Sequence, residues 1–239
     1  VDIEDLLPRD KIEVDMNAIK EMLTGRRILI TGAAGSIGSE MARQVATFAP
    51  SELVLVDQAE TPMHDVRLYM ARNHSDLKVW TIVGSITNQS QMEEIFSVHK
   101  PEFVFHAAAY KHVPMMEDNP AMAIQNNVFG TRVIADLAVK YNTKKFVMIS
   151  TDKAVNPTNV MGCSKRICEI YCQSLNKAIQ DGEIKGVTQF VTTRFGNVLG
   201  SNGSVIPLFK EQIRKGGPIT VTHKDIIRFF MLIPEACRL

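Results

Sequence analysis

The chain has 239 residues, enough for one large domain or for one complete domain with part of another. Its 45% hydrophobic and 22% charged residues, with 27 basic and 26 acidic side chains, are typical of an ordinary globular protein. No block of Lys or Arg indicates a nucleic-acid partner, and no apolar run approaches the roughly 18 residues that cross a bilayer. The four cysteines have no second cluster of ligands beside them and predict no metal site.

Three regions are expected along the chain, which is predicted to be cut from a longer protein. It begins at Val1 and stops shortly after the apolar run 229–233. Residues 1–24 are acidic and amphipathic and are expected to form an N-terminal arm or linker. Residues 25–199 are expected to form the main domain, and residues 200–239 the start of a smaller, truncated substrate-binding lobe.

Short apolar runs alternate with longer segments of helical period. The expected strands are residues 27–30, 53–56, 78–83, 103–106, 145–149 and 189–193. The expected helices are residues 36–48, 62–74, 89–99, 120–141 and 158–180. Nearly continuous hydrophobic strands that alternate with helices predict an α/β fold with a doubly wound parallel sheet, a Rossmann fold, covered on both faces. Ligands of such a sheet bind at the carboxyl ends of its strands.

A glycine-rich segment follows the first expected strand and predicts a dinucleotide site. Gly32, Gly35 and Gly38 have the spacing of a tight turn at which a pyrophosphate approaches the backbone and the next helix supplies free N–H groups. The second strand ends in Asp57, whose carboxylate can bind ribose hydroxyls and would repel a 2′-phosphate; Gln58 follows it. NAD is therefore predicted rather than NADP. Further contacts to NAD are expected from Ala34, Ser36, Ile37, Ser85, Ile86, Ala107, Ala108 and Ala109.

A second segment carries the expected chemistry. Thr151-Asp152-Lys153, followed by Met161 and Lys165, looks like a short-chain dehydrogenase active site in which the tyrosine has become methionine. A thioether has no proton to exchange, so tyrosine-assisted oxidation cannot run unchanged. Asp152 and Lys153 add an acid and a base that a simple dehydrogenase does not need. The combination indicates internal redox chemistry coupled to loss of water.

Several motifs together carry a more specific resemblance. They are residues 31–38, 106–114, 127–131, 150–165 and 194–198. With them the chain resembles the extended short-chain dehydrogenase/reductase superfamily, and within it the membrane-anchored, configuration-retaining UDP-N-acetylglucosamine 4,6-dehydratases of bacterial polysaccharide biosynthesis. The resemblance implies a lyase that acts in capsule, O-antigen or glycan synthesis. The sugar is oxidised at C4, water is eliminated across C5 and C6, and hydride returns to C6, so that NAD is regenerated and a UDP-4-keto-6-deoxy sugar is formed.

The resemblance also implies roles for single residues. Lys153 would be the C5 base and Asp152 the C6 acid, while Lys165 would hold the nicotinamide ribose and Met161 would pack against the ring and the sugar. Thr151, Asp152 and Lys165 stay open as the group that assists C4 oxidation. Substrate contacts are expected from Tyr110, Lys111, His112, Arg194, Asn197, Val205, Pro207 and Arg228.

Two other functions stay open at this point. A UDP-sugar 4-epimerase of the same fold would return hydride to C4 and would need no acid–base pair at C5 and C6. A catalytically silent NAD-binding scaffold would bind nucleotide without turnover. The resemblance further implies a UDP-sugar substrate, a homodimer or higher homo-oligomer, and no membrane contact by these residues. The need for NAD and a UDP-sugar places the domain in the cytoplasm, and the resemblance implies that the full-length protein is anchored at the inner membrane.

Overall fold

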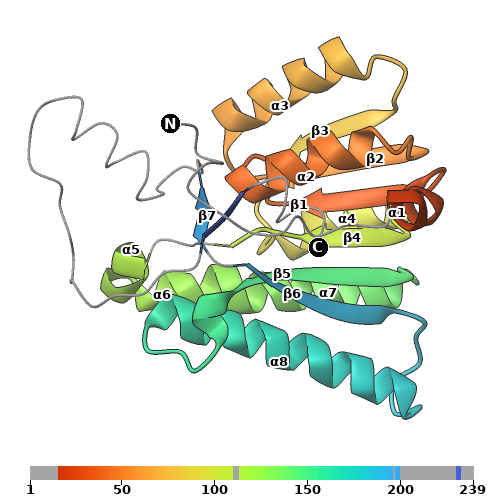
Figure 1. The fold of residues 1–239 in the computed structure, drawn as a ribbon. Coiled ribbons are helices and arrows are strands. Elements are labelled where there is room, and N and C mark those ends of the chain that lie inside the picture. The colour runs from red at the N-terminus through yellow and green to blue at the C-terminus, as the bar shows by residue number, and fades with distance from the viewer. Residues whose placement is uncertain (1–15, 110–112, 196, 200–229, 233–239) are drawn as a thin grey trace, which may run out of the picture.

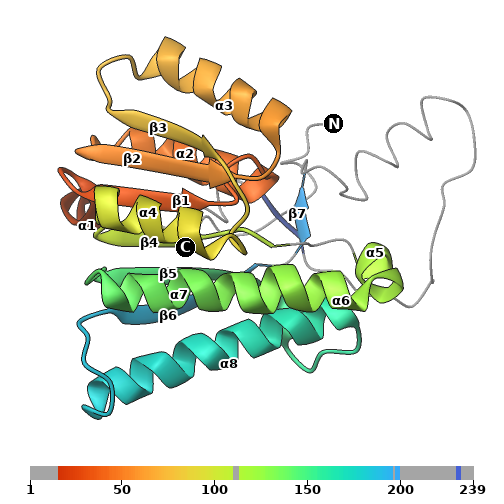
Figure 2. The same cartoon turned by 180° about the vertical axis from the view of Figure 1, so that it is seen from behind.

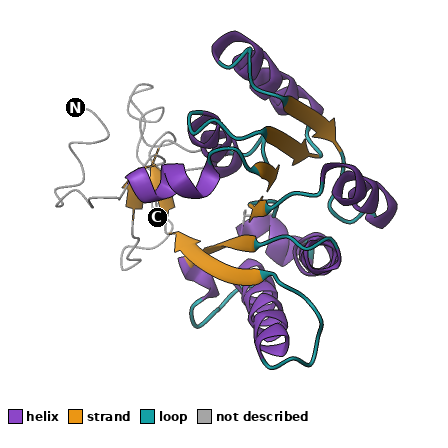
Figure 3. Cartoon of the chain, turned by 90° about the vertical axis from the view of Figure 1, so that its right-hand side faces the viewer, coloured by secondary structure: helices purple, strands orange, loops and turns teal. Residues whose placement is uncertain are grey.

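The computed structural model describes residues 16–109, 113–195, 197–199 and 230–232. Its main sheet has six parallel strands in the order β3-β2-β1-β4-β5-β6, in one layer between helices (Figures 1 and 3). The strands are β1 (Arg27–Thr31), β2 (Glu52–Asp57), β3 (Val79–Val83), β4 (Phe103–His106), β5 (Lys145–Thr151) and β6 (Gln189–Phe195). This order and the parallel pairing confirm the predicted doubly wound α/β fold, whose strand order reverses between β1 and β4.

Helices cover both faces of this sheet. They are α1 (Met16–Leu23), α2 (Ser36–Ala46), α3 (Glu60–Asn73), α4 (Gln89–His99), α5 (Val113–Asp118), α6 (Pro120–Ala123), α7 (Gly130–Lys140) and α8 (Val160–Gln180), with a π-helix η2 (Ile124–Phe129) and a 3₁₀ turn η3 (Asp152–Ala154). Side chains of α1, α2 and α3 pack on one face, and those of α4, α7 and α8 on the other, which faces the viewer in Figure 2. Apart from the main sheet, β7 (Asn197–Leu199) pairs in parallel with β8 (Phe230–Leu232).

The alternation along β1 explains why the strands are continuous hydrophobic runs. Ile28 and Ile30 belong to the apolar cluster of the first face, while Leu29 belongs to that of the second. All three side chains are at most 1% exposed. Burial of one such side chain contributes about 1.5–3 kcal/mol, so a strand covered on both faces has little room for polar residues.

Most helices and strands begin or end one or two residues away from the predicted bounds, and three regions show the more informative differences. β5 and β6 each run two residues further than the apolar runs, because the ladder continues through the pairs Ser150–Arg194 and Thr151–Phe195. The predicted single helix over residues 120–141 is instead α6, η2 and α7 in succession. Within the expected N-terminal arm, helix α1 packs on the first face of the sheet, and its Leu23 is 3% exposed.

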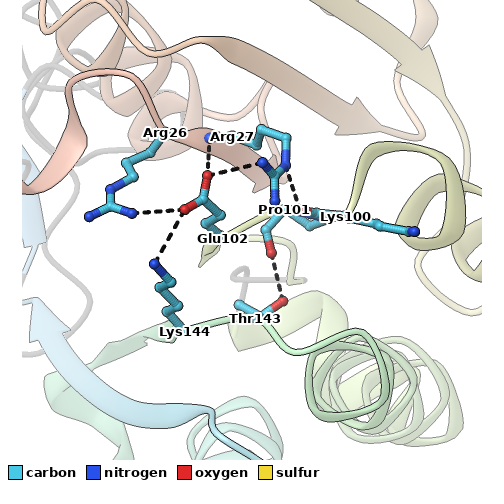
Figure 4. A network of polar contacts seen from close by, with 7 residues as sticks. All are labelled: Arg26, Arg27, Lys100, Pro101, Glu102, Thr143 and Lys144. Atoms are coloured by element: carbon cyan, nitrogen blue, oxygen red, sulfur yellow. Dashed lines mark hydrogen bonds and ion pairs between the residues drawn. The ribbon is translucent and has the colours of Figure 1, made fainter.

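One carboxylate ties together the amino ends of the central strands (Figure 4). Glu102, just before β4, pairs with Arg26 at 2.9 Å, Arg27 at 3.3 Å and Lys144 at 3.6 Å. Burial raises the pKa of Glu102, but hydrogen bonds from Arg26 and Arg27 lower it by more, and the net shift is downward. These contacts lie at the end of the sheet opposite to the expected ligand site. Glu102 therefore links the amino ends of the central strands through ion pairs, whereas the expected ligand site lies at their carboxyl ends.

In the part of the chain that the structure describes, no helix combines the length and the hydropathy needed to cross a bilayer. The same residues contain no group of three His, Cys, Asp or Glu side chains placed to hold a metal ion.

Candidate active site

A cavity of about 120 Å³ lies at the carboxyl ends of the central strands. Its walls are the glycine-rich turn after β1, the end of β2, the segments after β3 and β4, and one residue of η2. The lining residues are Gly32, Gly35, Val56, Asp57, Gln58, Gly84, Ser85, Ile86, Ala107, Ala108, Ala109 and Asn126. The cavity thus brings together most of the residues predicted to contact a dinucleotide. Those outside its lining are Ala34, Ser36, Ile37, Gly38 and Lys165.

The three glycines of the turn differ in how much space the structure leaves for a Cβ atom. Gly32 has a φ of +69°, and a Cβ there would lie 2.5 Å from the backbone nitrogen of Ala108. A Cβ at Gly38, in the first turn of α2, would lie 1.9 Å from the carbonyl oxygen of Gly32. At Gly35, in contrast, a Cβ would meet only that same oxygen, at 3.4 Å. Gly32 and Gly38 are therefore required by the fold of the turn, whereas Gly35 leaves open surface at the amino end of α2, where a phosphate group can bind.

Asp57 fixes this turn to the end of β2. Its carboxylate accepts hydrogen bonds from the backbone N–H of Ala34 at 3.1 Å and from that of Ala59 at 2.9 Å. The side chain is partly exposed and lines the cavity. A surface without Cβ atoms beside a helix amino terminus, with a carboxylate next to it, fits the pyrophosphate and the adenosine ribose of NAD.

The catalytic segment predicted from the sequence follows β5. Thr151 ends the strand, and its hydroxyl accepts a hydrogen bond from the Lys153 N–H at 3.3 Å. The backbone of Asp152 lies in η3, while its side chain is outside the described part of the molecule. Helix α8 presses against this turn, because a Cβ at Gly162 would lie 2.3 Å from the Lys153 carbonyl oxygen. The position of the turn is therefore set by a glycine one residue after Met161.

Met161 and Lys165 share the buried face of α8, as their spacing of four residues predicts, and they are 2% and 6% exposed. Met161 lies in an apolar cluster with Met116 and Ala123. The ammonium of Lys165 donates a hydrogen bond to the Ile149 carbonyl oxygen at 3.0 Å. Burial lowers the pKa of Lys165, with Cys168 and Glu169 acting in the opposite direction. Among the described residues, the structure thus places the buried Lys165 side chain at the carbonyl of Ile149, and the position expected for a tyrosine is held by Met161.

Arg194, predicted to contact the substrate, is held by a carboxylate that was not predicted from the sequence. Glu169 is fully buried and accepts two hydrogen bonds from the Arg194 guanidinium, at 2.7 and 2.8 Å, and one from Arg166 at 3.1 Å. Burial raises the pKa of Glu169, but its hydrogen bonds, that from Arg194 first, lower it by more. The Arg194 side chain is 38% exposed, but its removal would leave the buried Glu169 carboxylate without two of its hydrogen bonds. One edge of the Arg194 guanidinium is therefore occupied by Glu169.

The other residues predicted to contact the substrate have no described side chains. Asn197 lies in β7, but only its backbone is described. The remaining ones, which lie outside the described residues, are Tyr110, Lys111, His112, Val205, Pro207 and Arg228.

A buried histidine beside the cavity was also missed. The His106 ring lies between two hydroxyls, with Nδ1 2.7 Å from Thr31 Oγ1 and Nε2 2.8 Å from Thr131 Oγ1. Burial, followed by the charge of Lys165, lowers the pKa of His106 to about 3, so the ring is neutral. The signal in the sequence was a histidine at the end of an apolar strand, where a side chain without polar partners would be costly.

Known proteins match most or all of the chain. The model of the family described as "Polysaccharide biosynthesis protein" matches residues 28–239. The capsular polysaccharide biosynthesis protein CapD of Staphylococcus aureus is 50% identical over 240 residues, which are 100% of this chain and 39% of CapD. A protein of Rickettsia typhi named UDP-glucose 4-epimerase is 34% identical over 222 residues, which are 90% of this chain and 61% of that protein.

A solved structure shows the same fold. Pen from Bacillus thuringiensis superposes with a TM-score of 0.82 and 32% identity, over 90% of this chain and 64% of Pen. The chain therefore spans less than two thirds of the length of these three proteins, with 39% of CapD as the smallest share. The family match over residues 28–239, the identity to CapD and the doubly wound sheet lead to one conclusion. The chain belongs to the polysaccharide biosynthesis protein family, within the extended short-chain dehydrogenase/reductase superfamily.

Proposed function

We propose that the chain is the catalytic domain of an NAD-dependent nucleotide-sugar 4,6-dehydratase that acts on UDP-N-acetylglucosamine. One observation carries the proposal. The turn with Lys153 lies at the carboxyl end of β5, pressed there by Gly162, while the neighbouring Met161 is buried and offers no exchangeable proton. This arrangement suits an elimination that needs an acid and a base, and it does not suit oxidation assisted by a tyrosine. The identity to CapD supports a role in capsule or related polysaccharide synthesis.

NAD is proposed as the cofactor because of the glycine turn and Asp57. The open backbone at Gly35 would receive the pyrophosphate, and the Asp57 carboxylate, already fixed by the N–H groups of Ala34 and Ala59, would accept the ribose hydroxyls. Bound there, NAD would supply the hydride acceptor at C4 and the hydride donor at C6. The same carboxylate would repel the additional phosphate of NADP.

The residues after β5 would move the protons. In its neutral form Lys153 would take the C5 proton, which the C4 ketone acidifies, and Asp152 in its acid form would protonate the leaving C6 hydroxyl. One proton enters and one leaves, so the elimination balances with the release of a single water. The candidates to assist C4 oxidation, and to accept the proton that the C4 hydroxyl loses, are Thr151, Asp152 and Lys165.

The substrate would be held by residues after β4 and β6 and in the C-terminal region. Glu169 already engages one edge of the Arg194 guanidinium, so this residue would contact a diphosphate only through its remaining N–H groups. The other proposed contacts are Tyr110, Lys111, His112, Asn197, Val205, Pro207 and Arg228.

Isotope incorporation tests the proposal directly. The protein is incubated with NAD and UDP-N-acetylglucosamine in deuterated water, and the products are analysed by mass spectrometry and NMR. The expected product has lost one water and carries solvent deuterium at C5. Unchanged substrate, in a sample whose NAD binding has been verified by calorimetry, would contradict the proposal and would favour either another sugar or a silent scaffold.

A 4-epimerase is the second candidate, favoured by the identity to the Rickettsia typhi protein of that name. It would invert the hydroxyl at C4 and return hydride to that carbon, without exchange at C5. The incubation in deuterated water separates the two reactions. An isomer of unchanged composition, without deuterium at C5, would establish epimerisation in place of dehydration.

The proposal makes Gly162 a sensitive position. Gly162 is the third residue of α8, and alanine generally favours a helix more than glycine does. In Gly162→Ala the new methyl would lie 2.3 Å from the Lys153 carbonyl oxygen, so the turn with the proposed acid and base must move. We expect kcat to fall about 10- to 100-fold, because a displacement near 1 Å has effects of that size.

Steady-state kinetics and calorimetry check this expectation. The affinity for NAD should be unchanged, because Gly162 does not line the dinucleotide cavity. The exposed Gln173 lies on the same helix, and Gln173→Ala serves as the matched control with unchanged kcat. An unaltered kcat in Gly162→Ala would show that the position of the Lys153 turn does not limit the reaction.

A further inference from the structure

The His106 imidazole connects three parts of the chain that surround the dinucleotide cavity. Thr31, which it contacts through Nδ1, is the last residue of β1 and directly precedes Gly32. His106 itself ends β4 and directly precedes the cavity residues Ala107–Ala109. Thr131, which it contacts through Nε2, lies in the first turn of α7. All three side chains are at most 1% exposed, so these contacts face no competition from water.

The hydrogen bonds of the His106 ring with Thr31 and Thr131 can both form in either tautomer of the imidazole. A neutral imidazole has one N–H donor and one acceptor nitrogen, while each threonine hydroxyl can donate or accept. Whichever nitrogen carries the proton, one threonine accepts from the ring and the other donates to it. The nearby Lys165 ammonium and the complete burial both disfavour a second proton on the ring. His106 is therefore suited to hold two elements at a fixed separation and is unsuited to transfer protons.

The carboxyl ends of β1 and β4, which carry Thr31 and His106, lie close together. The backbone N–H of Ala107 donates to the Thr31 carbonyl oxygen at 3.0 Å. Just beyond this bond, a Cβ at Gly32 would lie 2.5 Å from the Ala108 nitrogen and 2.6 Å from the Ala107 carbonyl carbon. The glycine turn and the segment after β4 are thus in backbone contact, and both line the cavity. A small shift of β4 against β1 would change the shape of the cavity.

The contact with Thr131 fixes the third wall. The adjacent Gly130 packs so closely on Ile86 that a Cβ would lie 2.4 Å from its Cδ1 atom, and Ile86 lines the cavity. Asn126, which also lines the cavity, lies in the π-helix just before Gly130. A π-helical turn at this point is consistent with a functional constraint, since such insertions are frequent at functional sites.

We propose that His106 is a positioning residue for the dinucleotide, which sets the separation of the glycine turn, the Ala107–Ala109 segment and the start of α7. The inference rests on the NAD cofactor proposed above. It assigns to a buried side chain outside the cavity lining an effect on cofactor affinity in addition to its effect on stability.

The contacts at the two ring nitrogens can be tested separately. His106→Leu removes both contacts of the ring, while Thr131→Val removes the contact at Nε2 together with the hydrogen bond between Thr131 and the Cys168 thiol. His106→Asn keeps an amide near the position of Nδ1, and His106→Gln keeps one near that of Nε2. The Kd for NAD is measured by titration calorimetry without any sugar, at a temperature where thermal melts show every variant to be folded. We expect His106→Leu to weaken NAD binding about tenfold, the equivalent of one net hydrogen bond, and Asn or Gln to restore part of the loss.

A matched control separates positioning from stability. Thr143 is also fully buried, and its hydroxyl donates a single hydrogen bond, to the Pro101 carbonyl oxygen at 2.9 Å, at the opposite end of the sheet (Figure 4). Thr143→Val should lower Tm about as much as Thr131→Val while leaving the Kd for NAD unchanged. If Thr143→Val, Thr131→Val and His106→Leu all bind NAD with the same Kd, the positioning role of His106 is overturned while the proposed cofactor stands. A wild-type chain that does not bind NAD would overturn the proposed cofactor, and the positioning role with it.

Discussion

Replacing Lys153 with methionine is expected to lower the rate of dehydration by about 10²- to 10⁴-fold, the usual cost of losing a positioned acid or base. Methionine retains an unbranched side chain of similar length but has no group that can accept a proton. The rate of deuterium incorporation at C5 should fall by the same factor, because both observations report removal of the C5 proton. The affinity for NAD should stay within about twofold, since Lys153 does not line the dinucleotide cavity.

Two comparisons make this prediction specific. In Asp152→Asn the C5 base is retained, so deuterium should still enter at C5 while loss of water is suppressed. Lys185, exposed in the connection that precedes β6, is the control, and Lys185→Met should leave both rates unchanged. Dehydration at the wild-type rate in Lys153→Met would remove this residue from the mechanism and would leave another group as the C5 base.

The sheet could be predicted from the sequence because its strands are buried on both faces. Each of the six apolar runs became a strand, and the bound that differed most was the carboxyl end of β5 and of β6. There the polar pair Ser150 and Arg194 continues the ladder. An apolar run gives no signal for a polar extension of this kind, because the backbone hydrogen bonds of the neighbouring strand decide it.

The π-helix η2 could not be predicted, because tertiary contacts determine it. Asn127 within it donates to the Ser164 hydroxyl at 2.9 Å, and its own carbonyl oxygen accepts from the Cys168 thiol at 3.0 Å. Gly130, directly after it, packs against Ile86. None of these partners is near in sequence, so the helical period of residues 120–141 could indicate only one continuous helix.

The dinucleotide cavity was more predictable than the polar contacts that support it. Its residues follow strand ends, and a doubly wound sheet brings strand ends together, so the sequence alone was enough to group Gly32, Asp57 and Ala107. His106 and Glu169 could not be assigned in this way, because a buried polar side chain is identified by its partners. The partners of His106 and the Arg194 partner of Glu169 lie 25 or more residues away in the sequence.

Gly38→Ala is expected to weaken NAD binding by about 100-fold, because a shift near 1 Å in a binding loop has effects of that order. The new methyl would lie 1.9 Å from the Gly32 carbonyl oxygen and 2.7 Å from its carbon, both of them backbone atoms that no rotamer change can move. Helix α2 or the glycine turn must then shift, against the hydrogen bond that ties Ala34 to Asp57. Such overpacking costs about 1–3 kcal/mol, so Tm should fall by several degrees.

Gly35→Ala provides the comparison that assigns the cause. Gly35 has a φ of −71°, which alanine adopts without strain. Its methyl would meet one atom at an ordinary 3.4 Å, so Tm should be unchanged or slightly higher. The same methyl would occupy the surface proposed for the pyrophosphate, and calorimetry should show NAD binding weakened about tenfold or more. A Gly35→Ala variant with full NAD affinity would place the pyrophosphate away from the amino end of α2. If Gly35→Ala loses NAD affinity without losing stability, Gly35 belongs to the surface that contacts the cofactor. If Gly38→Ala loses both, Gly38 belongs to the packing that shapes this surface.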